Sequence, residues 1–511
     1  MPPAIPVDEP ETKPRRQSPW LFLTGAGLAV TVAFLPGVAD LPDAARATAA
    51  VAFLTAWCWL FEALPLPIAS LLPAFLLPAT GVAPAREVAP WYFQDILLLF
   101  LGGFILALAL ERYGLERRFA RRALLLFGTR PRRVVLGFML TCALLSMFIS
   151  NTSTALLMLP VALALLHACS EEEGRALQAP LLLGIAYSCS IGGLATPIGT
   201  APNSVLLGIT AERFPDAPEI GFGTWFIGAF PLTLAFLFLA WFVLVSVVSR
   251  LPSGQLDGLG VFLEGARGHG PRSPEQSRVL GVFLLVALLW MTRQGFDFGS
   301  FRIPGWRDLL PPTVQGTLAD STVALLGVVL LFLLPGQGRR GTLLDWEDCR
   351  DLPWGVLLLL GGGFALARAF TSSGLSTAIG DGMSAGLEML PLWGTVLLLC
   401  LTVTFLTEIT SNTATINILL PLLFSAAVAG GIHPMALAIP LTFSVSCAFM
   451  LPVATPPNAI LFSSGRLDIR TMARHGVILN LATAVLVTLF TFAWIAPRWG
   501  FDLGVFPDWA R

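Results

Sequence analysis

The sequence repeats one uncharged polar triplet inside two long apolar runs. Ser-Asn-Thr occurs in ISNTSTALLMLP at 150–152 and in TSNTATINILLP at 411–413. These residue types are favoured helix N-caps, so one copy alone would indicate capping. Two copies at equivalent positions instead predict two helix N-termini that present amide, hydroxyl and backbone N–H donors to an anion. The candidate substrate residues here are Ser150, Asn151, Thr152, Ser411, Asn412 and Thr413.

A second repeated motif combines Gly and Pro with Thr and Asn. It reads TPIGTAPN at 196–203 and VATPPN at 453–458. Gly and Pro interrupt helices, so each segment predicts an unwound stretch with free carbonyls, although a simple proline kink is the alternative. Carbonyl, hydroxyl and amide oxygens suit a small hard cation such as Na⁺. The candidate metal ligands are Ser146, Ser150, Asn151 and Gly199 in one half, and Thr407, Thr410, Asn412 and Ala454 in the other.

Two charged residues also lie within apolar segments. Glu408 precedes the second triplet by three residues. An intramembrane carboxylate indicates function, and proton coupling and a structural hydrogen-bonding role both remain open. Arg368 has no counterpart in the first half, where Leu108 takes its place, and the sequence does not identify its acidic partner.

The elements that position these residues must be membrane helices. The chain has 511 residues, 55% hydrophobic and 12% charged, with a mean hydropathy of +0.77, whereas soluble domains carry about 25% charged residues. Apolar segments of about 15 to 22 residues match the ~30 Å of a bilayer core. We therefore expect an all-α polytopic membrane protein with about 11 transmembrane helices and two re-entrant helical hairpins.

The hairpins follow from the lengths of the arms around each triplet. The arms 134–149 and 155–166 reach about 18–24 Å at ~1.5 Å per residue, which is short for a full crossing. The second copy, with arms 394–408 and 414–428, has the same form. Each triplet is therefore expected at a hairpin tip, in irregular backbone that must be buried in protein or line a cavity.

The two halves form an inverted repeat. LGGFILALALERYGL at 101–115 matches GGGFALARAFTSSGL at 361–375, and the later motifs follow in the same order. The arginine-rich connection 112–133 is expected in the cytoplasm, and 371–393, without Lys or Arg, outside. The external assignment of 294–318 conflicts weakly with its arginines. Inverted repeats with sites near the midplane are typical of secondary transporters.

Six motifs carry a resemblance to a known family: FEALPLP, LERYGLERR, SNTSTALLMLP, ATPIGTAPN, TEITSNTATINILLP and LPVATPPN. Over about residues 45–497 the chain resembles the divalent anion:sodium symporters, which carry di- and tricarboxylates and sulfate. The resemblance implies a homodimer in which a mobile transport domain moves like an elevator against a fixed scaffold. It also implies that the Asn and Thr residues of both triplets hold substrate carboxylate, with Thr200, Thr455 and Pro456 nearby, and that the candidate oxygens form two Na⁺ sites.

One departure from the family pattern concerns the first broken segment. Thr200-Ala201-Pro202-Asn203 stands where Thr-Pro-Pro-Asn is common, which leaves the size of the substrate open. The expected organisation is a cytoplasmic tail (1–18), scaffold helices (19–130), a first transport part (131–249), a cytoplasmic loop with further scaffold helices (250–392), a second transport part (393–498) and a C-terminal tail (499–511).

These observations predict a secondary transporter that couples Na⁺ entry to uptake of a small dianion, preferably a C4-dicarboxylate such as succinate, malate or fumarate. The alternatives are a Na⁺-independent dicarboxylate exchanger, a Na⁺-coupled citrate or sulfate carrier, or an anion channel. An enzyme is disfavoured because no His or Lys base is near Ser150 or Ser411 in sequence. The expected location is the plasma (inner) membrane with a cytoplasmic N-terminus, and the expected partners are dianion, Na⁺, lipid and a second copy, without nucleic acid.

Overall fold

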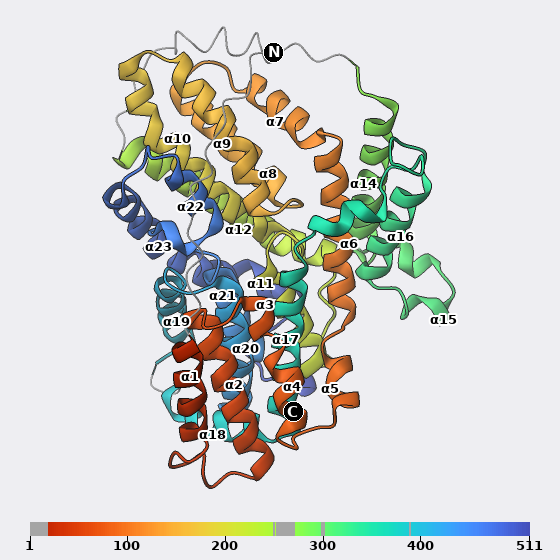
Figure 1. The fold of residues 1–511 in the computed structure, drawn as a ribbon, viewed down its shortest axis with the longest axis vertical. Helices are drawn as coiled ribbons and strands as arrows, with labels where there is room; N and C mark the ends of the chain where they lie inside the picture. Colours follow the sequence, from red (N-terminus) through yellow and green to blue (C-terminus); the bar gives the residue numbers. More distant parts are fainter. Residues whose placement is uncertain (1–18, 249–250, 252–270, 298–301, 388–389) are drawn as a thin grey trace.

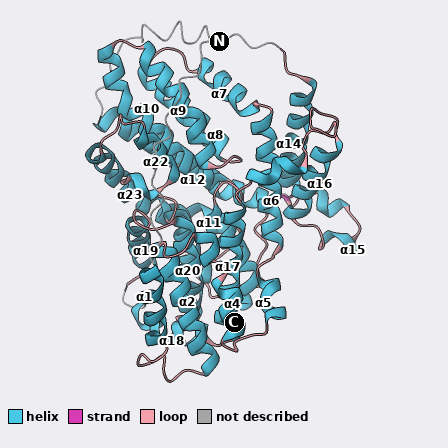
Figure 2. Ribbon diagram, viewed as in Figure 1, coloured by secondary structure: helices cyan, strands magenta, loops and turns pink. Residues whose placement is uncertain are grey.

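The chain is almost entirely helical. The computed structural model describes residues 19–248, 251, 271–297, 302–387 and 390–511 (Figure 1). Within these residues the strands are β1 (Gly295–Asp297) and β2 (Arg302–Pro304), which pair antiparallel, and helices make up nearly all other regular structure (Figure 2). The predicted all-α class is confirmed.

The first half of the chain ends in a long helix that continues into a π-helical turn. Its elements are α1 (Pro19–Val32), α2 (Asp43–Phe61), α3 (Leu66–Ala69), α4 (Leu72–Ala79), α5 (Ala85–Trp91), α6 (Asp95–Arg112), α7 (Leu115–Leu126), α8 (Pro131–Ser146), α9 (Asn151–Ala168), α10 (Glu171–Gly192), η1 (Gly193–Ala195), α11 (Ala201–Arg213), α12 (Phe222–Phe242) and η2 (Val243–Val248).

The second half also contains a long helix that continues into a π-helical turn, and two short helices follow it. Its helices are α14 (Pro274–Thr292), η3 (Trp306–Leu309), α15 (Pro312–Gln315), α16 (Asp320–Leu333), η4 (Trp346–Asp351), α17 (Trp354–Ser372), α18 (Leu375–Leu387), α19 (Leu392–Leu406), α20 (Asn412–Ala429), α21 (Pro434–Ser444), η5 (Pro452–Ala454), α22 (Pro456–Ser463), α23 (Ile469–Phe490), η6 (Thr491–Ile495), α24 (Ala496–Arg498) and η7 (Asp508–Ala510).

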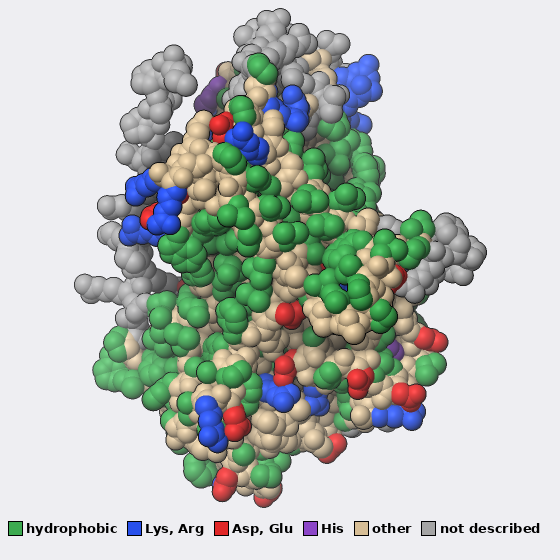
Figure 3. All heavy atoms as spheres, turned by 90° about the vertical axis from the view of Figure 1, so that its right-hand side faces the viewer, with side chains coloured by type: hydrophobic (Ala, Val, Ile, Leu, Met, Phe, Trp, Pro, Cys, Tyr) green, Lys and Arg blue, Asp and Glu red, His purple; other side chains and the backbone are tan. Residues whose placement is uncertain are grey.

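Many of these helices are long and apolar enough to lie within a lipid bilayer. In the described part of the chain, eight are long and apolar enough to cross a membrane, or nine if the bent pair α5–α6 forms one span. Shorter apolar helices include α1, α16, α19 and α21, so the expected number of about eleven spans depends on these. Hydrophobic side chains spread across the middle of the face in Figure 3, and most charged side chains visible there lie towards its two ends.

The repeat is visible in the order of the helices. The series α6, α7, α8, α9 recurs as α17, α18, α19, α20. The connections 112–133 and 371–393 were expected as loops, yet each contains a helix, α7 or α18. Each of these helices follows a glycine in the left-handed region, Gly114 (φ 63°) or Gly374 (φ 78°), a conformation that glycine adopts without the steric cost of a Cβ.

The two halves pack across one another. Both arms of the first hairpin, α8 and α9, pack on α10, and both arms of the second, α19 and α20, pack on α21. In addition, α22 packs on α9 and α10, whereas α11 packs on α20 and α21. The first hairpin lies in the upper half of Figure 1 and the second in the lower half. In each half, the helix that follows the unwound segment therefore packs against the hairpin of the other half.

Most buried apolar side chains belong to one core that runs through α6, α8–α12, α14 and α20–α23. Its largest members include Phe138, Tyr187, Trp225 and Phe364, all at most 1% exposed. A second cluster, which includes Trp59 and Leu77, joins α2 and α4 to α17. The unwound segments are therefore set in closely packed surroundings.

An ion-pair network holds two of the arginines in and beside the segment predicted outside, Arg293 and Arg307. Arg293, whose side chain is 1% exposed, pairs with Asp320 at 2.6 Å and also with Glu219. Arg307 pairs with Glu219 at 2.9 Å. Burial opposes ionisation of Glu219, but the two guanidinium groups outweigh it and hold its pKa below the usual range. Both arginines are thus paired with acids in the folded protein.

Candidate functional site

The first hairpin tip brings three oxygens together. α8 ends at Ser146 and α9 begins at Asn151, and the Ser146 hydroxyl lies 2.5 Å from Asn151 Oδ1. The same hydroxyl lies 2.7 Å from the carbonyl oxygen of Cys189, in α10. Ser146 is fully buried, while Asn151 is half-buried.

The second hairpin tip repeats this geometry. The Thr407 hydroxyl lies 2.6 Å from Asn412 Oδ1 and 2.8 Å from the carbonyl oxygen of Val445, just after α21. Thr407 is fully buried and Asn412 half-buried. Thr407 and Asn412 follow Ser146 and Asn151 by the same 261 positions, so the repeat extends to individual atoms.

Each tip holds more acceptors than one hydroxyl can serve. A Ser or Thr hydroxyl has one hydrogen to donate, but here it faces both an amide oxygen and a backbone carbonyl oxygen. Three oxygens within this space are a donor set for a hard monovalent or divalent cation. The backbone oxygens of Cys189 and Val445 could not be identified from sequence, because any residue type supplies a carbonyl.

Gly199 joins the first oxygen cluster through a close approach of backbone. A Cβ at Gly193 would lie 3.0 Å from Asn151 Oδ1 and 2.9 Å from Gly199 O, so those two oxygens face the same Cα. A side chain at Gly193 would push them apart. The structure therefore brings together Ser146, Asn151 and Gly199 from the predicted cation ligands.

The hydroxyl groups of two other predicted cation ligands, Ser150 and Thr410, make different contacts. The Ser150 hydroxyl caps α9 by accepting from Ser153 N at 3.0 Å, whereas Ser411 makes no such cap on α20. The Thr410 hydroxyl bonds to Thr415 Oγ1 at 2.7 Å and to Leu406 O. Ala454 lies in η5, and its backbone N–H donates to Leu451 O as that of Gly199 donates to Thr196 O, so a role for its carbonyl oxygen stays a prediction. The hydroxyl contacts of Ser150 and Thr410 do not join the oxygen clusters.

Two asparagines brace the unwound segments. Asn203 Nδ2 donates to the carbonyls of Gly193 and Thr196 at 2.9 and 2.7 Å. Asn458 Nδ2 donates to the carbonyls of Ala448 and Leu451, both at 3.1 Å.

Both asparagines are fully buried, and each donates to positions exactly equivalent by the 255-residue offset of the second motif. Their repetition in TAPN and TPPN was the sequence signal for this role. A buried carbonyl without a partner costs about 1–3 kcal/mol, so the bracing holds the segments open at little cost.

The remaining predicted substrate residues lie at helix N-termini. Thr200 is the N-cap residue of α11. Thr455 is the N-cap residue of α22, and its hydroxyl accepts from Asn458 N at 3.3 Å. Thr200, like Thr152 and Thr413, is half-buried, and Pro456 is exposed.

The helices α11 and α20 run side by side, and their N-termini lie at the same level along their axes. Asn417 in α20 donates to Leu359 O in α17, and further along α17, Phe364 lies against Gly208 of α11. Near the ends of the two helices, the rings of Phe214 and Phe424 meet at 5.1 Å. The three helices therefore run in the same direction. Counting back along each helix from the Phe214–Phe424 contact, at ~1.5 Å per residue, places the start of α11 level with the start of α20.

Glu408 holds the second unwound segment. Its carboxylate is 3% exposed and accepts from the backbone N–H groups of Phe449, Met450 and Leu451 at 2.7–2.9 Å. It also accepts from Asn480 Nδ2 at 2.7 Å. These four donors satisfy the hydrogen-bonding capacity of a buried carboxylate and tie the segment 449–451 to the second hairpin. Of the two roles left open by the sequence, this geometry supports the structural one.

Two solved transporter structures have a fold similar to that of this chain. The chain matches the Alcanivorax borkumensis YdaH transporter with a TM-score of 0.54 at 17% identity, covering 79% of this chain and 86% of that one. It matches Neisseria gonorrhoeae MtrF, described as illuminating a class of antimetabolite efflux pumps, with a TM-score of 0.55 at 14% identity, covering 91% and 98%.

Some curated proteins are more similar to this chain in sequence than these two structures are. The chain is 38% identical to a sodium-dependent dicarboxylate transporter of Staphylococcus saprophyticus, covering 91% of this chain and 89% of that one. It is 36% identical to Na⁺/dicarboxylate cotransporter 3 of Rattus norvegicus, covering 95% and 93%. The family model described as sodium:sulfate symporter transmembrane region matches residues 18–499. The chain is thus an integral, multi-pass membrane transporter, not an enzyme, and it belongs to the divalent anion:sodium symporter family.

Proposed function

We propose that this protein is a secondary active transporter that couples Na⁺ entry to uptake of a C4-dicarboxylate such as succinate, malate or fumarate. The observation that carries the proposal is the repeated oxygen cluster, Ser146–Asn151–Cys189 and Thr407–Asn412–Val445. Two similar relatives are named sodium-dependent or Na⁺-linked dicarboxylate transporters, which supports both the cation and the substrate class.

The proposed site would attract a dianion without a Lys or Arg side chain. α9 and α20 begin at the triplets, and their N-termini carry partial positive charge and unpaired N–H groups. Each triplet would bind one carboxylate of the dianion through its Asn and Thr side chains. A Na⁺ in each oxygen cluster would supply the remaining positive charge. Because each ligand then improves the binding of the other, coupling between Na⁺ and substrate follows.

The same proposal includes the larger organisation. The parts 131–249 and 393–498 would move as a transport domain, and 19–130 with 250–392 would form the scaffold of a homodimer. The two hairpins would be re-entrant, from opposite faces of the plasma (inner) membrane, with the N-terminus in the cytoplasm. The arginine-rich α7 region and the arginine-free α18 segment support this orientation.

The experiment is uptake of labelled succinate into proteoliposomes under an inward Na⁺ gradient, with K⁺ replacing Na⁺ as the control. Excess malate, citrate and sulfate serve as competitors. We expect uptake only with Na⁺ and strong competition by malate alone. Asn151→Ala or Asn412→Ala should abolish uptake while the protein still inserts, and normal uptake in either variant would contradict the site assignment.

The alternative functions give different results in the same experiment. A dicarboxylate exchanger would take up succinate only into vesicles preloaded with dicarboxylate, whether or not Na⁺ is present. A citrate or sulfate carrier would leave succinate outside. An anion channel would show neither saturation nor counterflow. Each of these results would replace the C4-symporter proposal.

A further inference from the structure

Two equivalent glycines of the repeat, Gly103 in α6 and Gly363 in α17, contact the proposed transport part. They occupy the same place in the matching motifs of the two helices, 260 positions apart. A Cβ at Gly103 would lie 3.1 Å from the Cδ1 atom of Ile198, in the first unwound segment. A Cβ at Gly363 would overlap with the side-chain amide of Asn417, in α20. Each glycine is thus a slot on the scaffold, but the two slots hold different elements of the repeat.

The repeat equivalents of these two slot residues are exposed. Val453 lies 255 positions after Ile198 and is 77% exposed, and Leu156 lies 261 positions before Asn417 and is 56% exposed. Ile198 and Asn417 are themselves 9% and 1% exposed. The two halves therefore repeat in sequence and fold but differ in what they place against the scaffold.

The same difference extends along the faces of the hairpin helices. Residues four apart in sequence lie on one face of a helix. Three such residues on α20 are buried: Asn417, Pro421 and Ser425. Their equivalents on α9 are exposed: Leu156, Pro160 and Ala164. The face that α20 buries is therefore left open on α9.

The helices that follow the unwound segments differ in the same way. On α11, Ser204 and Gly208 are buried, and a Cβ at Gly208 would overlap with the ring of Phe364 in α17. On α22, the equivalent residues Ala459 and Ser463 are exposed. The face that α11 buries against α17 is thus open on α22.

The packing of the helices accounts for both differences. α17 packs on α11 and α20, and α18 packs on α20 as well. The main packing partners of α9 are α8, α10 and α22, and those of α22 are α9, α10 and η5, all within the proposed transport part. Figure 1 shows α11, α17 and α20 close together, with α9 and α22 on the upper left and α6 on the right. One side of the repeat is therefore engaged with the scaffold here.

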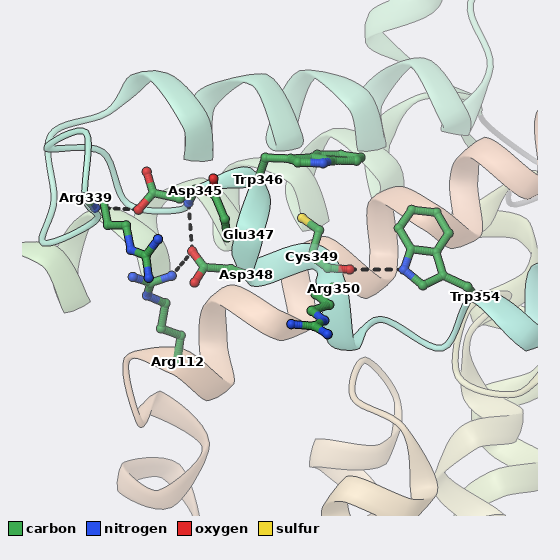
Figure 4. A pocket seen from close by; sticks show the side chains of 9 residues that line it. All are labelled: Arg112, Arg339, Asp345, Trp346, Glu347, Asp348, Cys349, Arg350 and Trp354. Atoms are coloured by element: carbon green, nitrogen blue, oxygen red, sulfur yellow. Dashed lines mark hydrogen bonds and ion pairs between the residues drawn. The ribbon is translucent and has the colours of Figure 1, made fainter.

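α6, the equivalent of α17, is anchored within the scaffold. It packs on α14 and α16. At its end, Arg112 forms an ion pair with Asp348 of η4, and Figure 4 shows the two side chains meeting there. A helix held in this way can serve as a fixed surface for the transport part.

We propose that the two slots exchange their occupants in the opposite end state of the transporter. Leu156 then docks at Gly103. Val453 docks at Gly363. The exposed faces of α9 and α22 pack on α6, as those of α20 and α11 pack on α17 here, because inverted repeats can make each other's contacts. This inference rests on the proposed movement of the transport part, and it adds the residues at which that movement ends.

The exchange also changes the chemistry of the contacts. Asn417 donates to Leu359 O at 3.3 Å, but its Oδ1 atom has no hydrogen-bond partner within the described residues. A buried acceptor without a partner opposes burial. Leu156 and Val453 have no polar side-chain atoms, so their burial in the opposite end state carries no such penalty and gains from the hydrophobic effect.

Disulfide crosslinking of the full-length protein in proteoliposomes tests the proposal, with copper phenanthroline as the oxidant and mass spectrometry of the crosslinked peptides as the readout. Gly103→Cys/Leu156→Cys should crosslink, because docking brings the two Cβ atoms within disulfide range. Gly103→Cys/Ala164→Cys is the matched control. Ala164 is exposed on the same face of α9 but about 12 Å further along it, so crosslinking should be at least about fivefold slower. Gly363→Cys/Asn417→Cys reports the state seen here and should also crosslink.

Gly363→Ala should shift the population towards the opposite end state. The added Cβ overlaps with the Asn417 amide here, whereas the equivalent apolar contact, at Gly103, leaves 3.1 Å. Crosslinking of the Gly103→Cys/Leu156→Cys pair should therefore be about fivefold faster in this background. Gly281→Ala in α14 is the control, since a Cβ there meets nothing within 4 Å, and it should leave the rate unchanged.

The outcomes separate this proposal from the proposed function, because crosslinking is scored without uptake. Equal rates for the Leu156→Cys and Ala164→Cys pairs with Gly103→Cys, alongside crosslinking of Gly363→Cys/Asn417→Cys, would overturn the exchange of occupants even if Na⁺-dependent succinate uptake were normal. Selective crosslinking of the Leu156→Cys pair without any succinate uptake would support the exchange and contradict the substrate assignment alone.

Discussion

Arg368 in α17 forms a 2.8 Å ion pair with Glu212 at the end of α11. Gln94, which precedes α6, donates to the other carboxylate oxygen of Glu212 at 3.0 Å, and Arg213 donates to Thr371 Oγ1 at 2.7 Å. Glu212 and Arg213 belong to the proposed transport part, and their partners belong to the proposed scaffold. The structure thus names the acid that pairs with Arg368.

If the transport part slides against the scaffold, this pairing cannot persist in both end states. Arg368→Gln and Glu212→Gln should each shift the population away from the state seen here, by up to about fivefold for a partly exposed pair. The measurement is the distance distribution between spin labels placed at Val314 and Glu172. The double variant should shift it no further than either single variant.

The matched control is the pair Arg175–Glu171 within α10, at 2.5 Å and equally charged. Because both residues lie on one helix, Glu171→Gln should leave the distance distribution unchanged. A fixed distance in all variants, with and without Na⁺ and succinate, would rule out the proposed movement between the two parts.

The oxygen clusters give a prediction about cation affinity. Ser146→Ala and Thr407→Val each remove one oxygen from a cluster and preserve the approximate volume, so the Na⁺ concentration for half-maximal uptake should rise by roughly tenfold or more. Uptake at saturating Na⁺ should be affected less. Sodium titration of succinate uptake in proteoliposomes measures the change.

The control variant for the clusters is Thr410→Val. The Thr410 hydroxyl bonds to Thr415 and Leu406 instead of the second cluster, so its removal should leave the Na⁺ dependence close to that of the wild type. If Thr410→Val raised the required Na⁺ as strongly as Thr407→Val, the cluster drawn from the contacts would be incorrect.

Glu408 should be needed for the fold of the second unwound segment. Glutamine keeps the size but removes the charge and turns an N–H₂ group toward backbone donors, so Glu408→Gln should destabilise the protein by about 2 kcal/mol or more. Thermal unfolding in detergent measures this, with Glu62→Gln, an exposed residue at the end of α2, as the control. A Glu408→Gln protein of normal stability whose uptake had lost its pH dependence would instead support proton coupling.

The network around Arg293 predicts unequal effects of two arginines. Arg293 is buried and bonded to Asp320, Glu219 and Leu318 O, so Arg293→Gln leaves a buried carboxylate unpaired and should cost about 3–5 kcal/mol. The side chain of Arg307 is 25% exposed, so Arg307→Gln should lower the free energy of unfolding by less than about 1 kcal/mol. The yield of monodisperse protein and its thermal stability compare them. Equal losses would show that burial is not the deciding factor.

The sequence was sufficient for the fold class and for the family because each rests on composition or on repeated motifs. Apolar segment length predicts helices, and the repeated triplets with their short flanking arms predict the hairpins. The polarity of the connections 112–133 and 371–393 predicts loops, yet α7 and α18 occupy them. Packing against the neighbouring helices α8 and α20 outweighs local polarity there.

Side-chain types could identify Ser146, Asn151, Thr407 and Asn412, but not the backbone oxygens of Cys189 and Val445 that complete each cluster. Ser150 shows the opposite case, since the same hydroxyl can cap a helix or bind a cation, and only the position of Ser153 N distinguishes them. The partners of Glu408 and Arg368 lie 41 or more positions away in sequence. Contacts of that range depend on the packing of whole helices.

The central claim is that Na⁺ and the dianion bind to the paired tips as one coupled unit. The most direct test is equilibrium binding of labelled succinate to the purified protein over a range of Na⁺ concentrations, with K⁺ holding ionic strength constant. The account predicts that affinity rises steeply with Na⁺ and that Ser146→Ala and Thr407→Val each weaken this rise. Succinate affinity that is the same in Na⁺ and in K⁺ would contradict it.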